Sequence, residues 1–248
     1  MLFRELAEIS DALAATRSRG EKIRILGSAL RRLEPDERRT AVAWLCGAHP
    51  GGRLGVGYAT IAELRNVTPA PRTALTIAET RARLDAIRTE TGKGSSERRR
   101  RILAELFGRA TRTEQDFLAK LLLGELRQGA LEGLMAEAIA FAAGLDTADV
   151  RRAIMLAGEV AVVAEAALAE GRAGLARFRL ELYEPVKPML ASLIEDVDAA
   201  LASLGEAAFE YKLDGARADS QRAERRPRIL AERPRRDGER PRDRATRR

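Results

Sequence analysis

Apolar residues recur every three or four positions over most of this sequence, and this spacing constrains the fold more than any other feature. Leu2, Leu6, Ile9 and Leu13 begin the pattern, which continues to about Gly171. A period near 3.6 residues places such side chains on one face of a helix. No alternation of strand and helix patterns interrupts the series, so the sequence predicts a mostly α fold.

Glycines and helix-initiating residues divide the pattern into separate helices. Pro35 is followed by Asp36 and Glu37, the composition of a first helical turn. Further helices are predicted over residues 73–90, 96–109, 113–123, 130–142, 147–157, 159–170 and 195–204, and a strand is predicted over 207–213. The pattern therefore changes after about residue 171, from successive helices to a linker-like segment with two prolines, a short helix and a strand.

A weak internal repeat relates residues 21–64 to residues 98–141 without gaps, at an offset of 77. Ten of the 44 aligned positions are identical, and biased composition inflates that number. The glycine pairs Gly47/Gly124 and Gly52/Gly129 are more informative, because they place two Gly-rich inter-helix loops in equivalent positions. We interpret this as a duplicated helical unit, with too few copies for a solenoid.

The net charge of +7 is concentrated at the C-terminal end of the sequence. Residues 219–248 hold 12 Arg against 6 acidic residues, which leaves +1 for the first 218 residues. This last segment has no aromatic residue and three prolines, and it is typical of a disordered Arg/Pro-rich tail. We therefore expect a helical domain over 1–177, a linker and domain start over 178–218, and a tail over 219–248.

Several classes of protein are excluded by single residue types. One cysteine, Cys46, and one histidine, His49, provide neither a disulfide framework nor a Cys/His metal site. This cysteine usage favours a reducing compartment, and we expect a cytoplasmic protein. No apolar run approaches the roughly 18 residues of a membrane span, so no membrane partner is expected.

The strongest chemical signal lies in residues 209–217, Phe-Glu-Tyr-Lys-Leu-Asp-Gly-Ala-Arg. The strand period of two places Glu210, Lys212 and Asp214 on one face. A lysine flanked by carboxylates is a candidate nucleophile, because its environment tunes the deprotonation that attack requires. Gly215 permits a tight turn after the strand. The alternative is an edge strand with a solvated charged face.

Glu210-x-Lys212-x-Asp214-Gly215-x-Arg217 resembles motif I of the covalent nucleotidyltransferases, which comprise DNA ligases, RNA ligases and mRNA-capping enzymes. Three upstream segments narrow this resemblance to bacterial ATP-dependent DNA ligases with a helical N-terminal DNA-binding domain. They are Gly-Lys-Gly-Ser-Ser at 92–96, Gly-Glu-Leu-Arg-Gln-Gly at 124–129 and Pro-x-x-Pro-Met-Leu-Ala at 185–191. The resemblance covers residues 1–218.

This resemblance implies ATP and Mg²⁺ as cofactors and nicked double-stranded DNA as partner, in replication, repair or recombination. Lys212 would be the catalytic residue that takes AMP from ATP, and the AMP would pass to the 5′-phosphate of the nick. Glu210 would lie near the adenine and Arg217 near the ribose or the nick phosphate. Asp214 and Gly215 would complete the cofactor-binding set, with Asp214 orienting the site.

The resemblance also implies that the helical domain grips DNA through Gly-rich loops and helix N-termini, whose N–H groups can bind phosphates. The candidate contacts are Gly52, Gly94, Ser95, Arg98, Arg127 and Gly129. The alternative for any single glycine is that it only caps a helix.

The family continues well beyond residue 218, so the resemblance implies an N-terminal fragment that is not competent for full ligation and that we expect to be monomeric. Residues 219–248 are either an out-of-frame translation product or a genuine basic tail. The alternative function is a non-enzymatic DNA-binding protein made of the helical domain and the basic tail. A capping-type guanylyltransferase is a more distant alternative.

Overall fold

The structure, a computed structural model, describes residues 1–48, 56–72, 74–126, 132–181, 186 and 194–205, with the backbone of 218–223 and 226–231. The chain divides into two parts, a helical unit of Met1–Arg179 and a second unit of Leu180–Arg248. The two units are described separately below.

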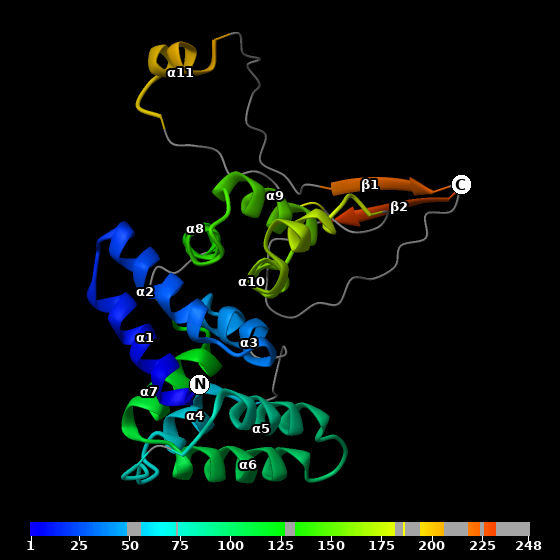
Figure 1. The fold of residues 1–248 in the computed structure, drawn as a ribbon. Coiled ribbons are helices and arrows are strands. Elements are labelled where there is room, and N and C mark those ends of the chain that lie inside the picture. Colours follow the sequence, from blue (N-terminus) through cyan, green and yellow to red (C-terminus); the bar gives the residue numbers. More distant parts are fainter. Residues whose placement is uncertain are drawn as a thin grey trace. The chain divides into compact units, whose positions relative to one another are not determined.

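In its described residues the helical unit contains ten helices, which confirms the mostly α fold class. They are α1 (Phe3–Ala15), α2 (Arg19–Arg32), α3 (Pro35–Leu45), α4 (Tyr58–Leu64), α5 (Ile77–Thr89), α6 (Ser95–Arg109), α7 (Arg112–Leu123), α8 (Glu132–Ala143), α9 (Thr147–Ala157) and α10 (Val160–Ala176) (Figure 1). The helices predicted between residues 96 and 157 begin and end within two residues of α6–α9. In the described residues, no helix combines the length and apolar character needed to cross a membrane.

Three helices differ from the predicted pattern. Helix α4 was not expected, and it is short, with only Ile61 and Leu64 buried. Helix α5 begins at Ile77 rather than at 73, because the Thr76 hydroxyl accepts a hydrogen bond from the backbone N–H of Glu79 and caps the helix there. Helix α10 runs past the predicted end at 170, but its backbone is not helical at Gly171.

The core of the helical unit is built around α1. Phe3 is fully buried and packs edge-on against Trp44 of α3, with ring centroids 5.8 Å apart, and against Phe117 of α7 at 5.5 Å. Aromatic pairs in these geometries contribute about 0.5–1.5 kcal/mol beyond their burial. The first helix therefore joins helices from both copies of the internal repeat.

The internal repeat of the sequence is present as a repeat of helices. The offset of 77 carries α2 onto α6, α3 onto α7, and α4 onto the middle of α8. The packing is reciprocal, because α2 packs on α8 while α6 packs on α4. The same reciprocity holds for two other pairs, because α1 packs on α7 while α5 packs on α3. Reciprocal contacts of this kind are what an approximate two-fold relation between two copies produces.

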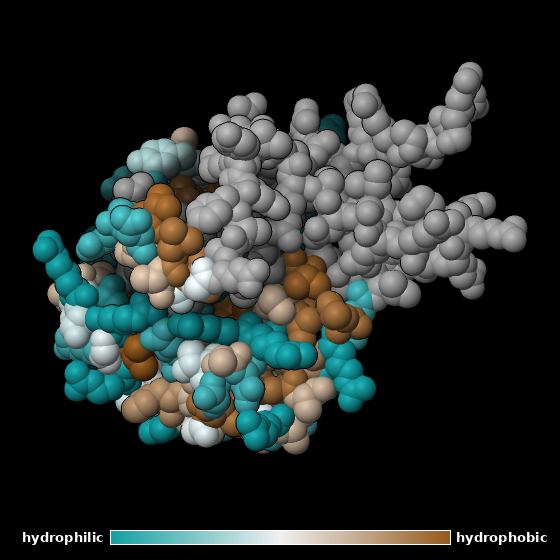
Figure 2. All heavy atoms as spheres, turned by 90° about the horizontal axis from the view of Figure 1, so that it is seen from above, coloured by the Kyte–Doolittle hydropathy of each residue, from teal (hydrophilic) through white to brown (hydrophobic). Residues whose placement is uncertain are grey.

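Ion pairs are frequent on the described surface of the helical unit, and Figure 2 shows hydrophilic side chains between groups of hydrophobic ones on the face in view. Glu137 of α8 lies 2.6 Å from Arg19 and 2.6 Å from Arg151, which connects three helices. The neighbouring guanidinium of Arg19, by hydrogen bond and charge, lowers the pKa of the Glu137 carboxyl. The large apolar side chains that stay exposed on described residues of this unit are Leu2, Tyr58 and Phe141.

The second unit contains helix α11 (Val197–Leu204) and two strands, β1 (Ala218–Ala223) and β2 (Arg226–Ala231). The strands pair antiparallel, with Ala218 opposite Ala231 and Ala223 opposite Arg226. The structure therefore differs from the expected irregular tail at these residues. The composition of the segment is polar, but two short stretches separated by two residues can satisfy each other's backbone groups, which composition does not reveal. The strand predicted over 207–213 lies outside the described residues.

Candidate nucleic-acid interface

Most of the predicted site residues lie outside the described part of the chain. These are Glu210, Lys212, Asp214, Gly215 and Arg217 of the lysine motif and Gly52, Arg127 and Gly129 of the Gly-rich loops. Their roles stay predictions. The structure does describe Gly94, Ser95 and Arg98, and it brings them together where α6 begins.

Two glycines form the turn that leads into α6. Gly92 has a φ of 78°, and Gly94, the N-cap of the helix, has a φ of 79°. Any other L-residue in this left-handed conformation costs about 1–2 kcal/mol. The N–H of Ser95 donates to the carbonyl oxygen of Gly92 over 3.1 Å, which closes the turn. The Gly-x-Gly spacing is therefore a requirement of the local backbone.

The guanidinium of Arg98 donates three hydrogen bonds to residues of this turn and the segment before it. Its Nε donates to the Glu90 carboxylate over 2.6 Å. Its two terminal nitrogens donate to the carbonyl oxygens of Lys93, over 3.0 Å, and Thr91, over 2.9 Å. A guanidinium is a rigid planar donor, and all three of its nitrogens are used here. In this structure the Arg98 guanidinium donates within the loop, and its candidate role as a phosphate contact stays a prediction.

The groups that face solvent at this turn are different ones. Among the described residues, neither the backbone N–H of Ser96 nor that of Glu97 has an acceptor, and no side chain caps the helix. The Lys93 side chain is exposed and also lacks a partner within the described ranges. Unpaired N–H groups at a helix start, together with a nearby ammonium, make an anion-binding surface. The Glu97 carboxylate, the one acid of this first turn, lies 3.9 Å from Arg100.

The starts of the two Gly-rich loops have the same backbone geometry. Gly47 after α3 has a φ of 74°, and Gly124 after α7 has a φ of 69°. The next residue in each case donates five positions back, Ala48 to Ala43 over 2.9 Å and Glu125 to Lys120 over 2.8 Å. This is the six-to-one bond of a Schellman C-cap. Both glycines therefore have the capping role that was the alternative for such residues.

The two loop starts also lie next to each other. A Cβ placed on Gly47 would lie 3.8 Å from the Cβ of Leu126, two residues after Gly124. The structure therefore brings together the flanks of the two segments that sequence analysis selected separately. Lys93 and the backbone of Ser96 and Glu97 were not among the predicted contacts. The Gly-Lys-Gly-Ser-Ser run contained a signal for them, because a glycine N-cap leaves helix N–H groups without a side-chain partner.

Comparisons with known proteins find sequence similarity to DNA ligases. Residues 56–140 match the family model described as DNA ligase N terminus. A protein named "Probable DNA ligase" from Anaeromyxobacter dehalogenans strain 2CP-1 is 57% identical over 225 residues, which are 90% of this chain and 44% of that protein. Proteins of the same name from Saccharopolyspora erythraea and Rhodococcus opacus strain B4 are each 48% identical over 88% of this chain, and the chain covers 42% and 43% of them.

The chain thus spans somewhat less than half the length of these curated relatives. The family match falls across α4–α8, the helices that carry the Gly94 turn and the second Gly-rich loop. The identity extends over nine-tenths of the chain at levels of 48–57%. Most of the chain is therefore similar to these proteins named "Probable DNA ligase", and residues 56–140 carry the match to the DNA ligase N-terminal model.

Proposed function

We propose that this chain is the DNA-gripping portion of an ATP-dependent DNA ligase, together with the lysine motif that begins its nucleotidyltransferase domain. The observation that carries the proposal is the 57% identity over 90% of the chain to a protein named "Probable DNA ligase". The domain limits that go with it are 1–177 for DNA binding and 178–218 for the start of the nucleotidyltransferase domain. The whole protein would act on nicked double-stranded DNA in replication, repair or recombination, as a cytoplasmic monomer.

The DNA-binding part of the proposal rests on the Gly94 turn. Phosphates would be bound by the exposed Lys93 ammonium and by the open N–H groups of Ser96 and Glu97. Arg98 would act through the shape of the turn, because its three nitrogens are already donors within it. Gly52, Arg127 and Gly129 of the Gly-rich loops would add contacts.

These two roles can be separated by the salt dependence of binding to a nicked duplex. Lys93→Ala should weaken binding and make the slope of log K against log salt shallower by about 0.9, because one phosphate contact is lost. Arg98→Lys keeps the charge but loses the planar fork, so it should weaken binding with the slope unchanged.

Arg4→Ala is the control, because it removes one exposed charge from α1, where Arg4 pairs with Glu8 at 2.7 Å. It should leave binding as it is. A shallower slope for Arg98→Lys, or full affinity for this variant, would contradict the positioning role. Unchanged binding for Lys93→Ala would contradict the interface itself.

The enzymatic part of the proposal concerns residues outside the described ranges, so it is derived from the motif alone. ATP supplies the adenylate group and Mg²⁺ would offset phosphate charge. Lys212 would be the acceptor, with Glu210, Asp214, Gly215 and Arg217 around the nucleotide. We expect no complete ligation from the 248-residue chain, because it spans less than half of its relatives.

Incubation with α-labelled ATP and Mg²⁺, followed by a denaturing gel, tests this part. Label on the wild type and none on Lys212→Ala would support the lysine as acceptor. The absence of label combined with salt-sensitive DNA binding would favour a non-enzymatic DNA-binding protein instead. Preferential labelling by GTP would favour a capping-type activity. Turnover in a nick-sealing assay would contradict the expected lack of full ligation.

A further inference from the structure

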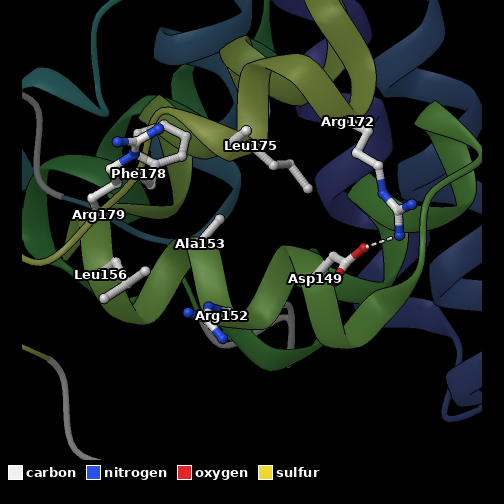
Figure 3. A pocket seen from close by; sticks show the side chains of 9 residues that line it. Asp149, Arg152, Ala153, Leu156, Arg172, Leu175, Phe178 and Arg179 are labelled. Carbon is white, nitrogen blue, oxygen red and sulfur yellow. Dashed lines mark hydrogen bonds and ion pairs between the residues drawn. The ribbon is translucent and has the colours of Figure 1, made fainter.

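A hollow of about 460 Å³ lies in the helical unit between α9 and the end of α10, away from the Gly94 turn in the sequence. Its lining combines Ala153 and Leu156 from α9 with Leu175 and Phe178 from the end of α10 and just beyond it. In Figure 3 these side chains face one another across the hollow. None of the residues that the lysine motif or the Gly-rich loops contribute lies in it.

Two glycines shape the end of α10, which carries Arg172 and Leu175 of the lining. Gly171 has φ 58° and ψ −133°, so the chain leaves the helical path there and starts a new turn. Gly174 then packs so closely that a Cβ would lie 2.2 Å from the carbonyl oxygen of Ala166. The turn of residues 172–176 is thereby fixed against the first part of α10, and Leu175, only 7% exposed, points toward α9 (Figure 3).

Arginines surround the apolar floor of the hollow, which is formed by Ala153, Leu156, Leu175 and Phe178. Arg172 forms an ion pair with Asp149 over 2.9 Å, which closes one end of the hollow in Figure 3. Arg152 and Arg179 also line the hollow and are exposed, and neither has a hydrogen-bond or ion-pair partner among the described residues. Asp149 is the one acidic lining residue, and its charge is already matched by Arg172. The lining therefore has two guanidinium groups in excess.

We propose that this hollow binds a short acidic peptide segment of another protein, with one aliphatic or aromatic side chain on the floor and flanking carboxylates on Arg152 and Arg179. Guanidinium groups bind carboxylates through two parallel hydrogen bonds. The apolar floor gives an anchor side chain a surface to bury. A phosphodiester backbone would use the arginines but has no apolar group for Leu156 and Leu175, so the lining favours the peptide over nucleic acid.

The test uses the 248-residue chain and a fluorescein-labelled peptide Asp-Asp-Leu-Phe-Asp-Asp, followed by fluorescence anisotropy. Saturable binding is expected, and the double variant Arg152→Ala/Arg179→Ala should weaken it by about tenfold or more, since two charge-assisted contacts are lost. Leu156→Ser should also weaken it. Arg83→Ala, which removes an equal charge from α5, should leave the dissociation constant unchanged.

Two control peptides should both bind more weakly, Asn-Asn-Leu-Phe-Asn-Asn because it lacks the side-chain carboxylates, and Asp-Asp-Ala-Ala-Asp-Asp because it lacks the large apolar side chains. No saturable binding, or equal binding of the Asn peptide, would overturn the proposal. Displacement of the probe by an unlabelled DNA duplex, with loss of DNA affinity in the double variant, would assign the hollow to nucleic acid instead. DNA affinity is expected to persist in the double variant, which separates this site from the Gly94 turn.

Discussion

Helices α2–α4 and α6–α8 start from equivalent sequence positions, yet they are held in the structure by different contacts. Leu26 of α2 and Leu103 of α6 are both fully buried at equivalent positions. The helix ends after α3 and α7 also use the same capping geometry, at Gly47 and Gly124. The local signals of the repeat are thus preserved in both copies.

The third helix of each copy, α4 in the first and α8 in the second, makes different contacts. The guanidinium of Arg31 donates to the carbonyl oxygens of Phe141 and Ala142 of α8, over 2.8 and 3.1 Å, and lies over the Phe141 ring at 4.9 Å. In the other copy α4 is shorter, and Arg100 only approaches Glu63 at 3.5 Å. A repeated sequence therefore reproduces caps and core positions, whereas the reciprocal packing differs in strength between the α2–α8 and α4–α6 contacts.

The largest difference is expected at the equivalent acids Glu37 and Glu114. The Glu37 carboxylate accepts from the Met1 ammonium over 2.7 and 2.8 Å, and both groups are nearly buried. Glu37→Ala should cost about 3–5 kcal/mol of unfolding free energy, because a buried ammonium is left without its partner. Glu114 accepts from the N–H and hydroxyl of Thr111 instead, and Glu114→Ala should cost about 1–3 kcal/mol. Urea unfolding that gives equal losses would contradict this assignment.

The equivalent leucines test whether the two cores are matched. Leu26→Ala and Leu103→Ala each leave a cavity at a fully buried position, and each should cost about 2–5 kcal/mol. Chemical denaturation of both variants measures the two losses. A loss below about 1 kcal/mol for either variant would mean that its surroundings collapse, and that the two copies do not share one packing density.

The capping glycines should respond alike. Gly47→Ala and Gly124→Ala each place a Cβ on a residue with positive φ, so each should lower the unfolding temperature by an amount equivalent to about 1–2 kcal/mol. Thermal unfolding followed by circular dichroism compares them. Exposed Gly20 on α2 has open space around it, so Gly20→Ala is a control that should be neutral or stabilising. Stabilisation by Ala at Gly47 or Gly124 would rule out the shared cap.

The smallest effect is a pH dependence at Glu137 of α8. The Arg19 hydrogen bond lowers the pKa of the Glu137 carboxyl below its usual 4.5, with Arg151 contributing in the same direction. The stability from this group is present above the unfolded-state pKa and is lost as the pH falls through the folded pKa. The stability difference between wild type and Glu137→Gln should therefore shrink on acidification. A difference independent of pH would show that the ion pairs of Glu137 contribute nothing.

The sequence was sufficient where a local rule decides the structure. Periodicity and glycines placed α6–α9, and the Gly-x-Gly spacing at 92–94 marked a turn that does need two left-handed residues. It was insufficient where packing decides. Helix α4 buries only Ile61 and Leu64, which is too weak a pattern to recognise, and the two strands after residue 217 depend on mutual pairing.

In the candidate site, too, some features follow from the local sequence and others only from packing. The motif around Lys212 and the loop at Gly94 could be selected from residue types alone. The role of Arg98 could not, because its direction is set by three acceptors that are made available only by the folded turn. The hollow beside α9 was also beyond prediction, since its lining comes from two helices whose packing no local pattern gives.

Our central proposal is that the helical unit holds DNA through phosphate contacts. Its most direct test is the equilibrium binding of the 248-residue chain to a nicked duplex over a range of salt concentrations. Log K should fall linearly with log salt, and the double variant Lys93→Ala/Arg127→Ala should have a slope shallower by about 1.8. A salt-independent affinity, no binding at low salt, or an unchanged slope in the double variant would contradict it.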